Sequence, residues 1–575
     1  MKFNVKSAGL IIALMALAAL AGYHYGRHRG RTTVIRQQSP AAEPARTSST
    51  RLTPPIAGAT YVGGHWPKNV INAFRRERVA ADFARLRADG FNAVMLLVSW
   101  GDFQPVFDPC CRYDERAFER LEYLLDQARD AGLDVVLRVG YGWTFHPDAG
   151  DVGARTQRLL NETGVRDAFA AYAARIGAIA RKHANVRATM LSWEDLWLHG
   201  IDPAGRPDFE RFLATLPDGD ARRSKPGSGL PAQGGDDAPL FNAYWDWLMM
   251  QQVFRPLAER LPNLTYEARI DREPLFKVDA AGAKSIDAWI GHETTYRPPG
   301  ADVISLYWAP FWGARNEGEK LDAGQALRLF GRLLDDVHEH SGGLPMFIDQ
   351  LNIIDNTLGF EHNATLQPAA YAAFAAGALC TMRKAGVFGY AYWTTDDYAE
   401  SPLYNPAFAY GLDGWNLATT DHTPPAQRLQ KRTSGDFDLH LLAGDRLTQS
   451  IPARRGRFPG TRDSGPVPAR ICLAARDGAA ADVEAGAGAP PVRLRLTGSA
   501  RTCTEIATAP AGNSLELGVR VLSGSADLTD VMLFDHVQQG GLHGFDGADG
   551  VLLEPLRALN RDFADPARAD AACGR

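Results

Sequence analysis

The sequence predicts a (β/α)₈ TIM barrel followed by a small antiparallel β-sandwich, and three features of the chain lead to this fold class. Eight short apolar segments lie between residues 59 and 392. Amphipathic helical patterns, several of them ending at a glycine, separate these segments. After about residue 430 the chain changes to short, partly alternating strands between Gly, Pro and Asp turns.

The barrel is predicted because continuous apolar segments suit strands that are buried on both faces, and alternation with helices implies parallel pairing. The predicted strands are Ala59–Val62, Asn92–Val98, Asp134–Val139, Thr189–Trp193, Leu264–Arg269, Val303–Tyr307, Pro345–Ile348 and Val387–Tyr392. The predicted helices are Arg78–Asp89, Asp114–Gly132, Val165–His183, Asn242–Leu261, Ala323–His340 and Pro368–Lys384. A doubly wound open sheet is the alternative, although no Gly-rich phosphate loop follows the first strand.

The C-terminal part of the chain is predicted to form the β-sandwich. Its strands are expected at Asp438–Leu442, Ala469–Ala474, Val492–Leu496, Ser514–Val521 and Asp530–Phe534. We therefore expect a barrel domain over residues 57–430, a β-sandwich domain over 431–540 and a C-terminal tail over 541–575. The tail shows only a short helical pattern, over Leu553–Asn560.

Residues 1–29 are predicted to be a signal peptide or an N-terminal membrane anchor. Two lysines precede an apolar run over Ala8–Gly22, and Ala19–Ala21 offers an A-x-A cleavage site. If this site is not cut, residues 7–26 would attach the chain to the inner membrane. A buried N-terminal core helix is the third interpretation. Residues 30–56 are predicted to be a linker, and both export routes place the rest of the chain in the periplasm or outside the cell.

The composition excludes several classes of protein. Of 575 residues, 45% are hydrophobic and 22% charged, which is the profile of a globular protein rather than of a disordered chain, a collagen or a coiled coil. The net charge of −5 argues against a nucleic-acid-binding protein. Six cysteines suit an exported protein, and Cys472 and Cys503 are predicted to pair. No cysteines show the C-x-x-C spacing of a zinc site, and no metal or organic cofactor is implied.

Polar and aromatic residues gather where the predicted strands end, which is where a barrel carries its active site. The residues expected to bind substrate there are His65, Trp66, Trp100, Trp143, Tyr307, Gln350, Trp393 and Asp396. Hydrolysis of a glycosidic bond needs one carboxyl to protonate the leaving oxygen and a second to attack or to activate water. Carboxylates beside tryptophan rings at strand ends therefore suit sugar chemistry.

Short motifs mark the second, fourth and eighth predicted strands. They are Phe91–Val94 followed by Val98–Trp100, Ser192–Glu194, and Tyr390–Trp393. In this order they resemble the motifs of the retaining glycoside hydrolases built on a (β/α)₈ barrel, the clan that includes cellulases, mannanases and β-galactosidases. The resemblance covers residues 58–415. It implies that Glu194 is the general acid/base and that Trp393 lies under the sugar at the cleavage point.

The sequence departs from the pattern of this clan at two positions. Trp193 stands where the clan has the Asn before the acid/base, and Gln350 falls on the position of the Glu nucleophile. An amide cannot act as that nucleophile, so the second carboxylate is expected to be Asp349 or, after it, Glu293. Strand alternation directs Asp349 away from the side that Gln350 faces, unless the strand has ended or contains a bulge. A cap or turn role is the other interpretation of Asp349.

The sequence thus predicts an exported glycoside hydrolase that acts on a polysaccharide or oligosaccharide, with a bacterial exopolysaccharide as one candidate. The β-sandwich is expected to buttress the barrel or to help hold the substrate. Two alternatives remain open. A catalytically inactive polysaccharide-binding barrel is favoured by Gln350, and a transglycosylase differs only in that a sugar, instead of water, takes the intermediate.

Overall fold

The computed structural model describes the barrel and the β-domain with several gaps. The described residues are 54–66, 70–140, 146–150, 152–191, 206–224, 230–231, 237–268, 275–278, 284–288, 293–310, 318–357, 363–452, 467–478, 480–509, 511 and 514–574. The predicted signal peptide or anchor lies outside them, as does nearly all of the predicted linker. Within the described ranges, no helix combines the length and the apolar character that crossing a membrane requires.

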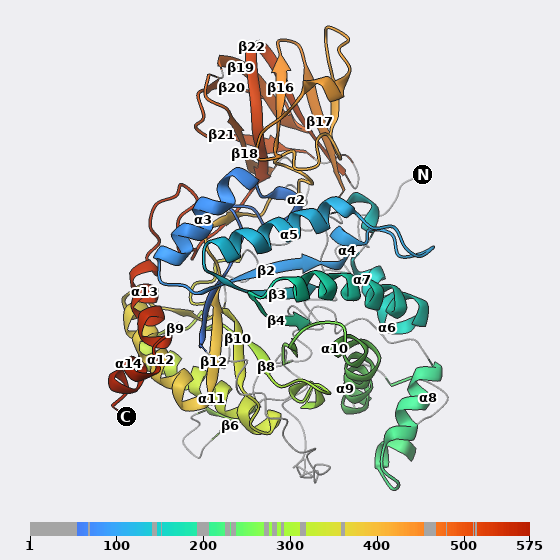
Figure 1. Ribbon diagram of the computed structural model, residues 1–575, viewed down its shortest axis with the longest axis vertical. Coiled ribbons are helices and arrows are strands. Elements are labelled where there is room, and N and C mark those ends of the chain that lie inside the picture. The colour runs from blue at the N-terminus through green and yellow to red at the C-terminus, as the bar shows by residue number, and fades with distance from the viewer. Residues whose placement is uncertain are drawn as a thin grey trace. The chain divides into compact units, whose positions relative to one another are not determined.

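Eight parallel strands form the central sheet, in the spatial order β5-β4-β3-β2-β1-β12-β10-β8 (Figure 1). Their bounds are β1 Ile56–Thr60, β2 Ala93–Ser99, β3 Asp134–Gly140, β4 Val186–Leu191, β5 Leu264–Tyr266, β8 Ile304–Trp308, β10 Met346–Leu351 and β12 Val387–Tyr392. All eight predicted strands are present, and the predicted barrel fold is confirmed. The first strand begins and ends earlier than the predicted Ala59–Val62.

The sheet closes between its two edge strands, β5 and β8. The backbone N–H of Ala268 donates to the carbonyl of Ser305 over 2.7 Å. The hydroxyl of Thr265 donates to the carbonyl of Val303 over 2.9 Å, and Glu267 pairs with Ser305 in a parallel bridge. These contacts turn an open eight-stranded sheet into a barrel, so both of its edges are satisfied.

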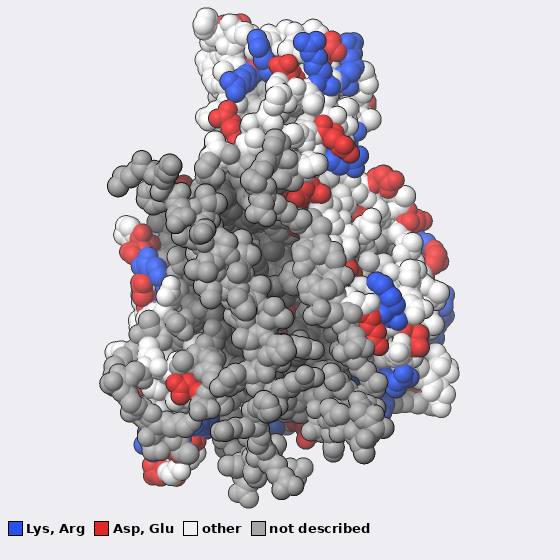
Figure 2. Space-filling model, turned by 180° about the vertical axis from the view of Figure 1, so that it is seen from behind, with Lys and Arg blue, Asp and Glu red and all other residues white. Residues whose placement is uncertain are grey.

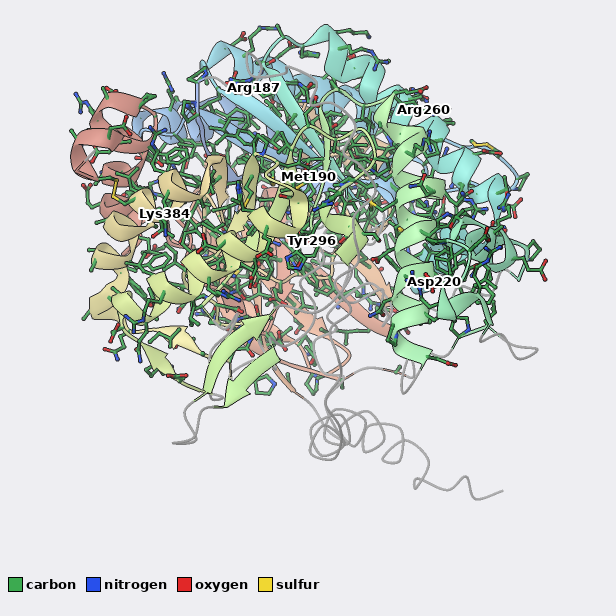
Figure 3. The ribbon with its side chains drawn as sticks, turned by 90° about the horizontal axis from the view of Figure 1, so that it is seen from below. Arg187, Met190, Asp220, Arg260, Tyr296 and Lys384 are labelled. Carbon is green, nitrogen blue, oxygen red and sulfur yellow. A yellow bond between two sulfur atoms is a disulfide. The ribbon has the colours of Figure 1, made fainter. Side chains whose placement is uncertain are left out.

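The enclosed part of the barrel begins with a layer of apolar side chains. This layer consists of Ile56, Ala93, Met95, Val136, Val303, Phe347 and Ala391. Because successive side chains of a strand point to opposite faces, the next inward residue of each strand lies two residues further toward the C-terminal end. On β3 that residue is Arg138, and on β4 it is Met190, which is labelled near the centre of Figure 3.

Helices surround the barrel strands. They are α2 Val70–Ala73, α3 Arg76–Ala88, α4 Trp100–Phe103, α5 Glu115–Asp130, α6 Val152–Asn161, α7 Thr163–Lys182, α8 Arg206–Thr215, α9 Ala238–Trp247, the π-helical η7 Leu248–Phe254, α10 Arg255–Ala258, α11 Ala323–Ser341 and α12 Tyr371–Ala385. Local sequence fixes several ends. Asp114 caps α5 by accepting from the N–H of Arg116. Gly342 and Gly386 end α11 and α12 in the left-handed conformation, with φ of 72° and 75°.

Short elements join the barrel units. The 3-10 helix η8 covers Glu293–Tyr296, and two-residue strands β9 Lys320–Leu321 and β11 Thr365–Leu366 pair in parallel. Strands β6 Leu275–Val278 and β7 Lys284–Ala288 form an antiparallel pair. The remaining one-turn helices are η3 Pro147–Ala149, η5 Ala221–Ser224, η9 Pro368–Ala370 and η10 Pro425–Arg428.

The C-terminal β-domain is built from mostly antiparallel strands. They are β14 Asn416–Ala418, β15 Leu429–Lys431, β16 Phe437–Leu442, β17 Arg446–Pro452, β18 Val467–Ala475, β19 Ala480–Ala487, β20 Val492–Thr497, β21 Thr502–Thr508 and β22 Ser514–Phe534. The segments predicted as two strands, Ser514–Val521 and Asp530–Phe534, are one continuous strand, β22, which pairs with β16, β17, β18 and β19. The predicted disulfide between Cys472 and Cys503 is confirmed, and it joins directly paired residues.

The chain returns from the β-domain to the barrel. Strand β23 Val537–Gln538 pairs with β13 Tyr398–Ala399, which follows the last barrel strand. Two helices, α13 Leu553–Phe563 and α14 Pro566–Ala572, then pack beside α12, red against yellow in Figure 1. A disulfide between Cys380 and Cys573 fixes this arrangement. The tail is therefore part of the helical layer of the barrel.

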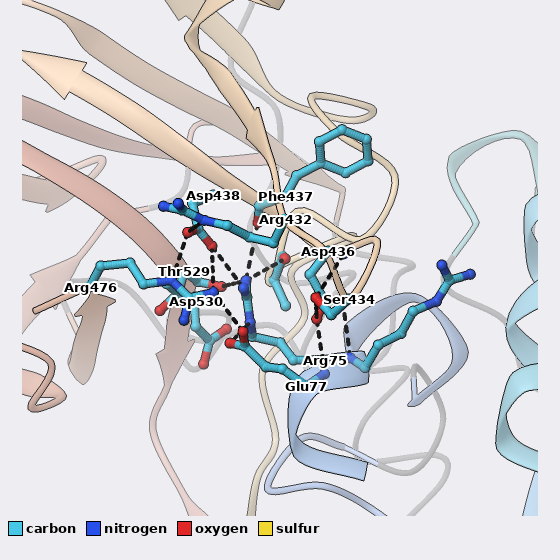
Figure 4. Close-up of polar contacts among 12 residues, drawn as sticks. Arg75, Glu77, Arg432, Ser434, Asp436, Phe437, Asp438, Arg476, Thr529 and Asp530 are labelled. Atoms are coloured by element: carbon cyan, nitrogen blue, oxygen red, sulfur yellow. Dashed lines mark hydrogen bonds and ion pairs between the residues drawn. The ribbon is translucent and has the colours of Figure 1, made fainter. Parts of the chain in front are cut away.

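A buried ionic network joins the β-domain to the barrel (Figure 4). The Arg75 guanidinium donates to Asp438 over 2.7 Å and to the carbonyls of Phe437 and Thr529 over 3.1 and 3.0 Å. The Asp436 carboxylate accepts from the first N–H groups of α3, both over 3.0 Å. Elsewhere, charges of both signs are interspersed over the described surface in the view of Figure 2, in keeping with the small net charge.

Candidate active site

A β-bulge lies near the C-terminal end of β10. Against β8, Ile348 pairs with Leu306 but Gln350 pairs with Tyr307, so β10 has one residue more than its neighbour. A corresponding shift occurs against β12, between Ile348 and Leu351. The extra residue is Asp349. The bulge that allows Asp349 and Gln350 to face the same side of the strand is therefore present.

The bulge turns two consecutive polar side chains to the barrel interior. Phe347 belongs to the enclosed apolar layer, so Asp349 also faces inward by alternation. Gln350 lies beside Tyr307, whose neighbour Trp308 stacks outward on Phe374 of α12 with a centroid separation of 4.8 Å. Tyr307 and Gln350 therefore face inward as well. Asp349 lies within a strand, so the cap or turn interpretation is wrong.

Asp349 forms a buried ionic cluster with residues of two other strands. The Arg138 Nη2 atom donates to Asp349 Oδ1 over 2.6 Å and to Glu267 Oε2 over 3.2 Å. The side chains of Arg138, Asp349 and Glu267 are only 1%, 0% and 6% exposed. The Met190 sulfur lies 3.9 Å from the same nitrogen. Charges buried this deeply are tolerated because each has an opposite partner.

The two carboxylates of this cluster lie close together. Because both accept from one nitrogen, at 3.2 and 2.6 Å, Glu267 Oε2 and Asp349 Oδ1 lie no more than about 6 Å apart. Sequence analysis did not single out Glu267. The available signal was a carboxylate within the apolar strand segment Leu264–Arg269, two residues after Thr265 and therefore on the same face.

Three residues predicted to take part in the chemistry or in binding cannot be placed as side chains. Glu194 and Trp143 lie outside the described residues. Glu293 begins η8, a segment that packs against α9 and α11, and its neighbour Thr294 donates to Asp246 over 2.8 Å. The structure thus brings together Asp349, Gln350 and Tyr307 among the described residues, and their roles stay predictions.

Two of the predicted sugar-binding residues lie in ionic contacts away from the Arg138 cluster. His65 Nε2 lies 3.4 Å from Asp530 Oδ1 on β22, and the other oxygen of Asp530 meets Arg501 at 3.3 Å. Burial raises the pKa of Asp530, but His65 and the nearby arginines outweigh it and hold the pKa below its usual value. Asp396 binds Arg85 of α3 over 2.8 Å.

The predicted tryptophan platforms are buried to different degrees. Trp100 is fully buried between Phe169, at a centroid distance of 5.0 Å, and Arg155, whose guanidinium carbon lies 4.1 Å from its ring. The structure therefore places Trp100 in the core behind the strands. Trp66 is 7% exposed and belongs to the same core. Trp393 is 9% exposed and meets Tyr398 edge to face, with centroids 6.2 Å apart.

A search for metal-binding arrangements gives no candidate in the described part of the chain. No group of three or more His, Cys, Asp or Glu side chains there is placed to hold a metal ion. The described cluster at Arg138 offers two carboxylates to a guanidinium instead. Carboxylates are groups that can act as general acids, general bases or nucleophiles.

No family model and no curated protein matches the sequence. Solved structures that match include an exo-β-1,4-mannosidase from Opitutaceae bacterium strain TAV5, at 19% identity and a TM-score of 0.38 over 61% of this chain and 53% of that one. A GH5_18 protein from Streptomyces cattleya matches at 14% identity and a TM-score of 0.39, over 60% of this chain and 72% of that one. An endo-1,4-β-mannanase from Rhizomucor miehei matches at 10% identity and a TM-score of 0.36, over 59% of this chain and 86% of that one.

The chain spans about half the length of the mannosidase. These matches are distant, so the reaction and the substrate of this chain have to be argued from its own residues.

Proposed function

We propose that the chain is a glycoside hydrolase that cleaves a polysaccharide, with Glu194 as general acid/base and Asp349 as the second carboxylate. One observation carries the proposal. Asp349 faces the barrel interior by strand alternation and contacts Arg138 there, near the C-terminal strand ends where barrel enzymes place their reacting groups, and the bulge in β10 turns Gln350 inward beside it. In the sequence, Glu194 comes three residues after the last residue of β4.

Arg138 supports the role of Asp349. A carboxylate that attacks an anomeric carbon must be ionised, and an opposite charge in direct contact favours the ionised form. The 2.6 Å contact also fixes the orientation of the carboxylate. In the proposed reaction Asp349 attacks the anomeric carbon while Glu194 protonates the leaving oxygen. Water, deprotonated by Glu194, then releases the sugar from Asp349.

The neighbouring side chains suit a sugar. Gln350 and Tyr307 lie side by side on the inner face, and both offer hydrogen bonds to hydroxyl groups. In this proposal Gln350 binds substrate and Asp349, its neighbour on the bulge, reacts. The proposal also includes export through the N-terminal segment, which would bring the enzyme to a polysaccharide outside the cytoplasm.

The test is release of reducing ends from a panel of β-linked polysaccharides, including bacterial exopolysaccharides, by the full chain. Glu194→Gln is expected to reduce release by at least about a hundredfold, the usual scale of acid/base catalysis. Glu115→Gln, which changes an exposed ion pair with Arg175, is the matched control and should leave release unchanged. A polymer that wild type binds but does not cleave would overturn the hydrolase and support the binding barrel.

A further inference from the structure

We propose that Glu267 is a positioning residue that acts through Arg138 to set the protonation of Asp349. The inference rests on the proposed function, because it assigns a role to Asp349 as a reacting carboxylate. It concerns a residue that neither the strand-end pattern nor the sequence motifs single out. Glu267 lies just after β5, on the opposite side of Arg138 from the β10 bulge.

The geometry that carries the inference is the sharing of one nitrogen atom. Arg138 Nη2 donates to both carboxylates. Its contact with Asp349 is 2.6 Å long and its contact with Glu267 is 3.2 Å long. A positive charge in contact favours the ionised form of a carboxylate and a nearby negative charge disfavours it, so Arg138 and Glu267 act on Asp349 in opposite directions. The opposing effects meet in a site where each side chain is almost fully buried, so little solvent screens them.

Among the described residues, the other groups that face Asp349 are weakly polar or apolar. Strand β8 presents Ser305 and Tyr307 from one side, and β12 presents Ala391 from the other. Strand β4 presents Met190. Among the described residues at this level of the barrel, the charged or titratable groups on the inner face are thus Arg138, Glu267 and Tyr307. Glu267 is the carboxylate positioned to tune Asp349.

The experiment is the pH profile of kcat/KM for reducing-end release by the full chain. The acid limb reports the pKa of the carboxyl that must be ionised in the free enzyme. Glu267→Gln removes a negative charge, so the acid limb is expected to move to lower pH by about one unit. Glu267→Asp keeps the charge and is expected to restore the wild-type limb. Glu115→Gln is the matched control and should leave the limb in place.

Several results would overturn the inference, and one of them, azide rescue of Glu267→Ala, would also overturn the role proposed for Asp349. A Glu267→Gln limb that superimposes on that of the wild type would make Glu267 a purely structural partner of Arg138. Rescue of Glu267→Ala by azide would make Glu267 a reacting group. If Glu267→Gln is inactive at every pH, the Glu267→Asp variant becomes the test. An acid limb of Glu267→Asp that differs from that of the wild type, or no activity in this variant, would also refute the inference. Inactivity of the wild type on all polymers would refute the proposed function instead.

Discussion

Arg138 is a charged side chain enclosed by the barrel, and its two carboxylate partners make its presence tolerable. Removing one member of such a buried cluster leaves uncompensated charge in a medium that solvates it poorly. Arg138→Met is therefore expected to lower the free energy of unfolding by about 3–5 kcal/mol at neutral pH. Urea unfolding followed by fluorescence measures this.

Arg129→Met is the control for that experiment. Arg129 pairs with Asp126 and Asp130 on the surface of α5, where ion pairs contribute less than about 1 kcal/mol. A loss no larger for Arg138→Met than for Arg129→Met would show that the cluster does not hold the barrel interior together.

Asp336 makes a second prediction at the scale of a single residue. Burial on α11 raises the pKa of Asp336 to about 6, against the opposing effects of Arg332 and His340. The folded state thus binds a proton more tightly than the unfolded state. The resulting stability is fully present below the unfolded pKa near 4 and is lost as the pH rises through 6.

Asp336→Asn keeps the shape of the protonated side chain and removes the ionisation. Its melting temperature is expected to exceed that of the wild type at pH 7.5 and to approach it at pH 4. Asp335→Asn, on the exposed face of the same helix, should show no such trend. An Asp336→Asn variant that is less stable than wild type at pH 7.5 would contradict a pKa of Asp336 raised by burial.

Helix α7 offers a test at the scale of one element. A Cβ added to Gly177 would overlap the carbonyl oxygen of Arg260, whereas one added to Gly164 meets open space. Gly177→Ala is expected to lower stability by about 1–3 kcal/mol because α7 must move away from the end of α10. Gly164→Ala should be neutral or stabilising, since alanine favours a helix. Equal melting temperatures for the two variants would show that this close approach is not needed.

Elements whose signals are local were predictable from the sequence. Asp114 at the start of α5 and the glycines that end α11 and α12 act within one helical turn. The β22 strand was not predictable as one element, because Gly524, with φ of 76°, looks like a turn residue. In the structure it lies where β22 bends and changes partners.

In the candidate site too, some features follow from local sequence and others depend on how distant strands pair. The position of Asp349 at the end of the seventh barrel strand follows from the sequence, but Gln350 faces the same side only because of a bulge that pairing with β8 and β12 defines. The contacts of His65 and Asp396 depend on β22 and α3, respectively. Glu267 could be recognised only once its contact with Arg138 of β3 was known.

At the scale of the whole molecule, the Arg75 network makes the barrel and the β-domain depend on each other. Burial raises the pKa of Asp438, but Arg476, Arg432 and Arg75 outweigh it and hold the pKa below its ordinary value. Arg75→Met removes the guanidinium that bonds Asp438 and two backbone carbonyls. Calorimetry is expected to show one transition for wild type and two separated transitions for Arg75→Met.

Arg446→Met is the control for this experiment, because Arg446 forms an exposed pair with Glu516 within the β-domain. A single, unshifted transition for Arg75→Met would mean that the two domains are joined by other contacts. If only the lower-temperature transition of Arg75→Met is lost, the domain that melts in it is the less stable one and depends on the Arg75 network.

The most direct test of the central claim is azide rescue of Asp349→Ala. With the folded state verified by its melting curve, this variant is expected to lose reducing-end release by at least about a thousandfold. Azide should then occupy the space of the missing carboxylate, attack the anomeric carbon and restore cleavage, with a glycosyl azide as the product seen by mass spectrometry. Release at the wild-type rate by Asp349→Ala without azide would contradict the claim, because the inward carboxylate of β10 would then not be the one that reacts.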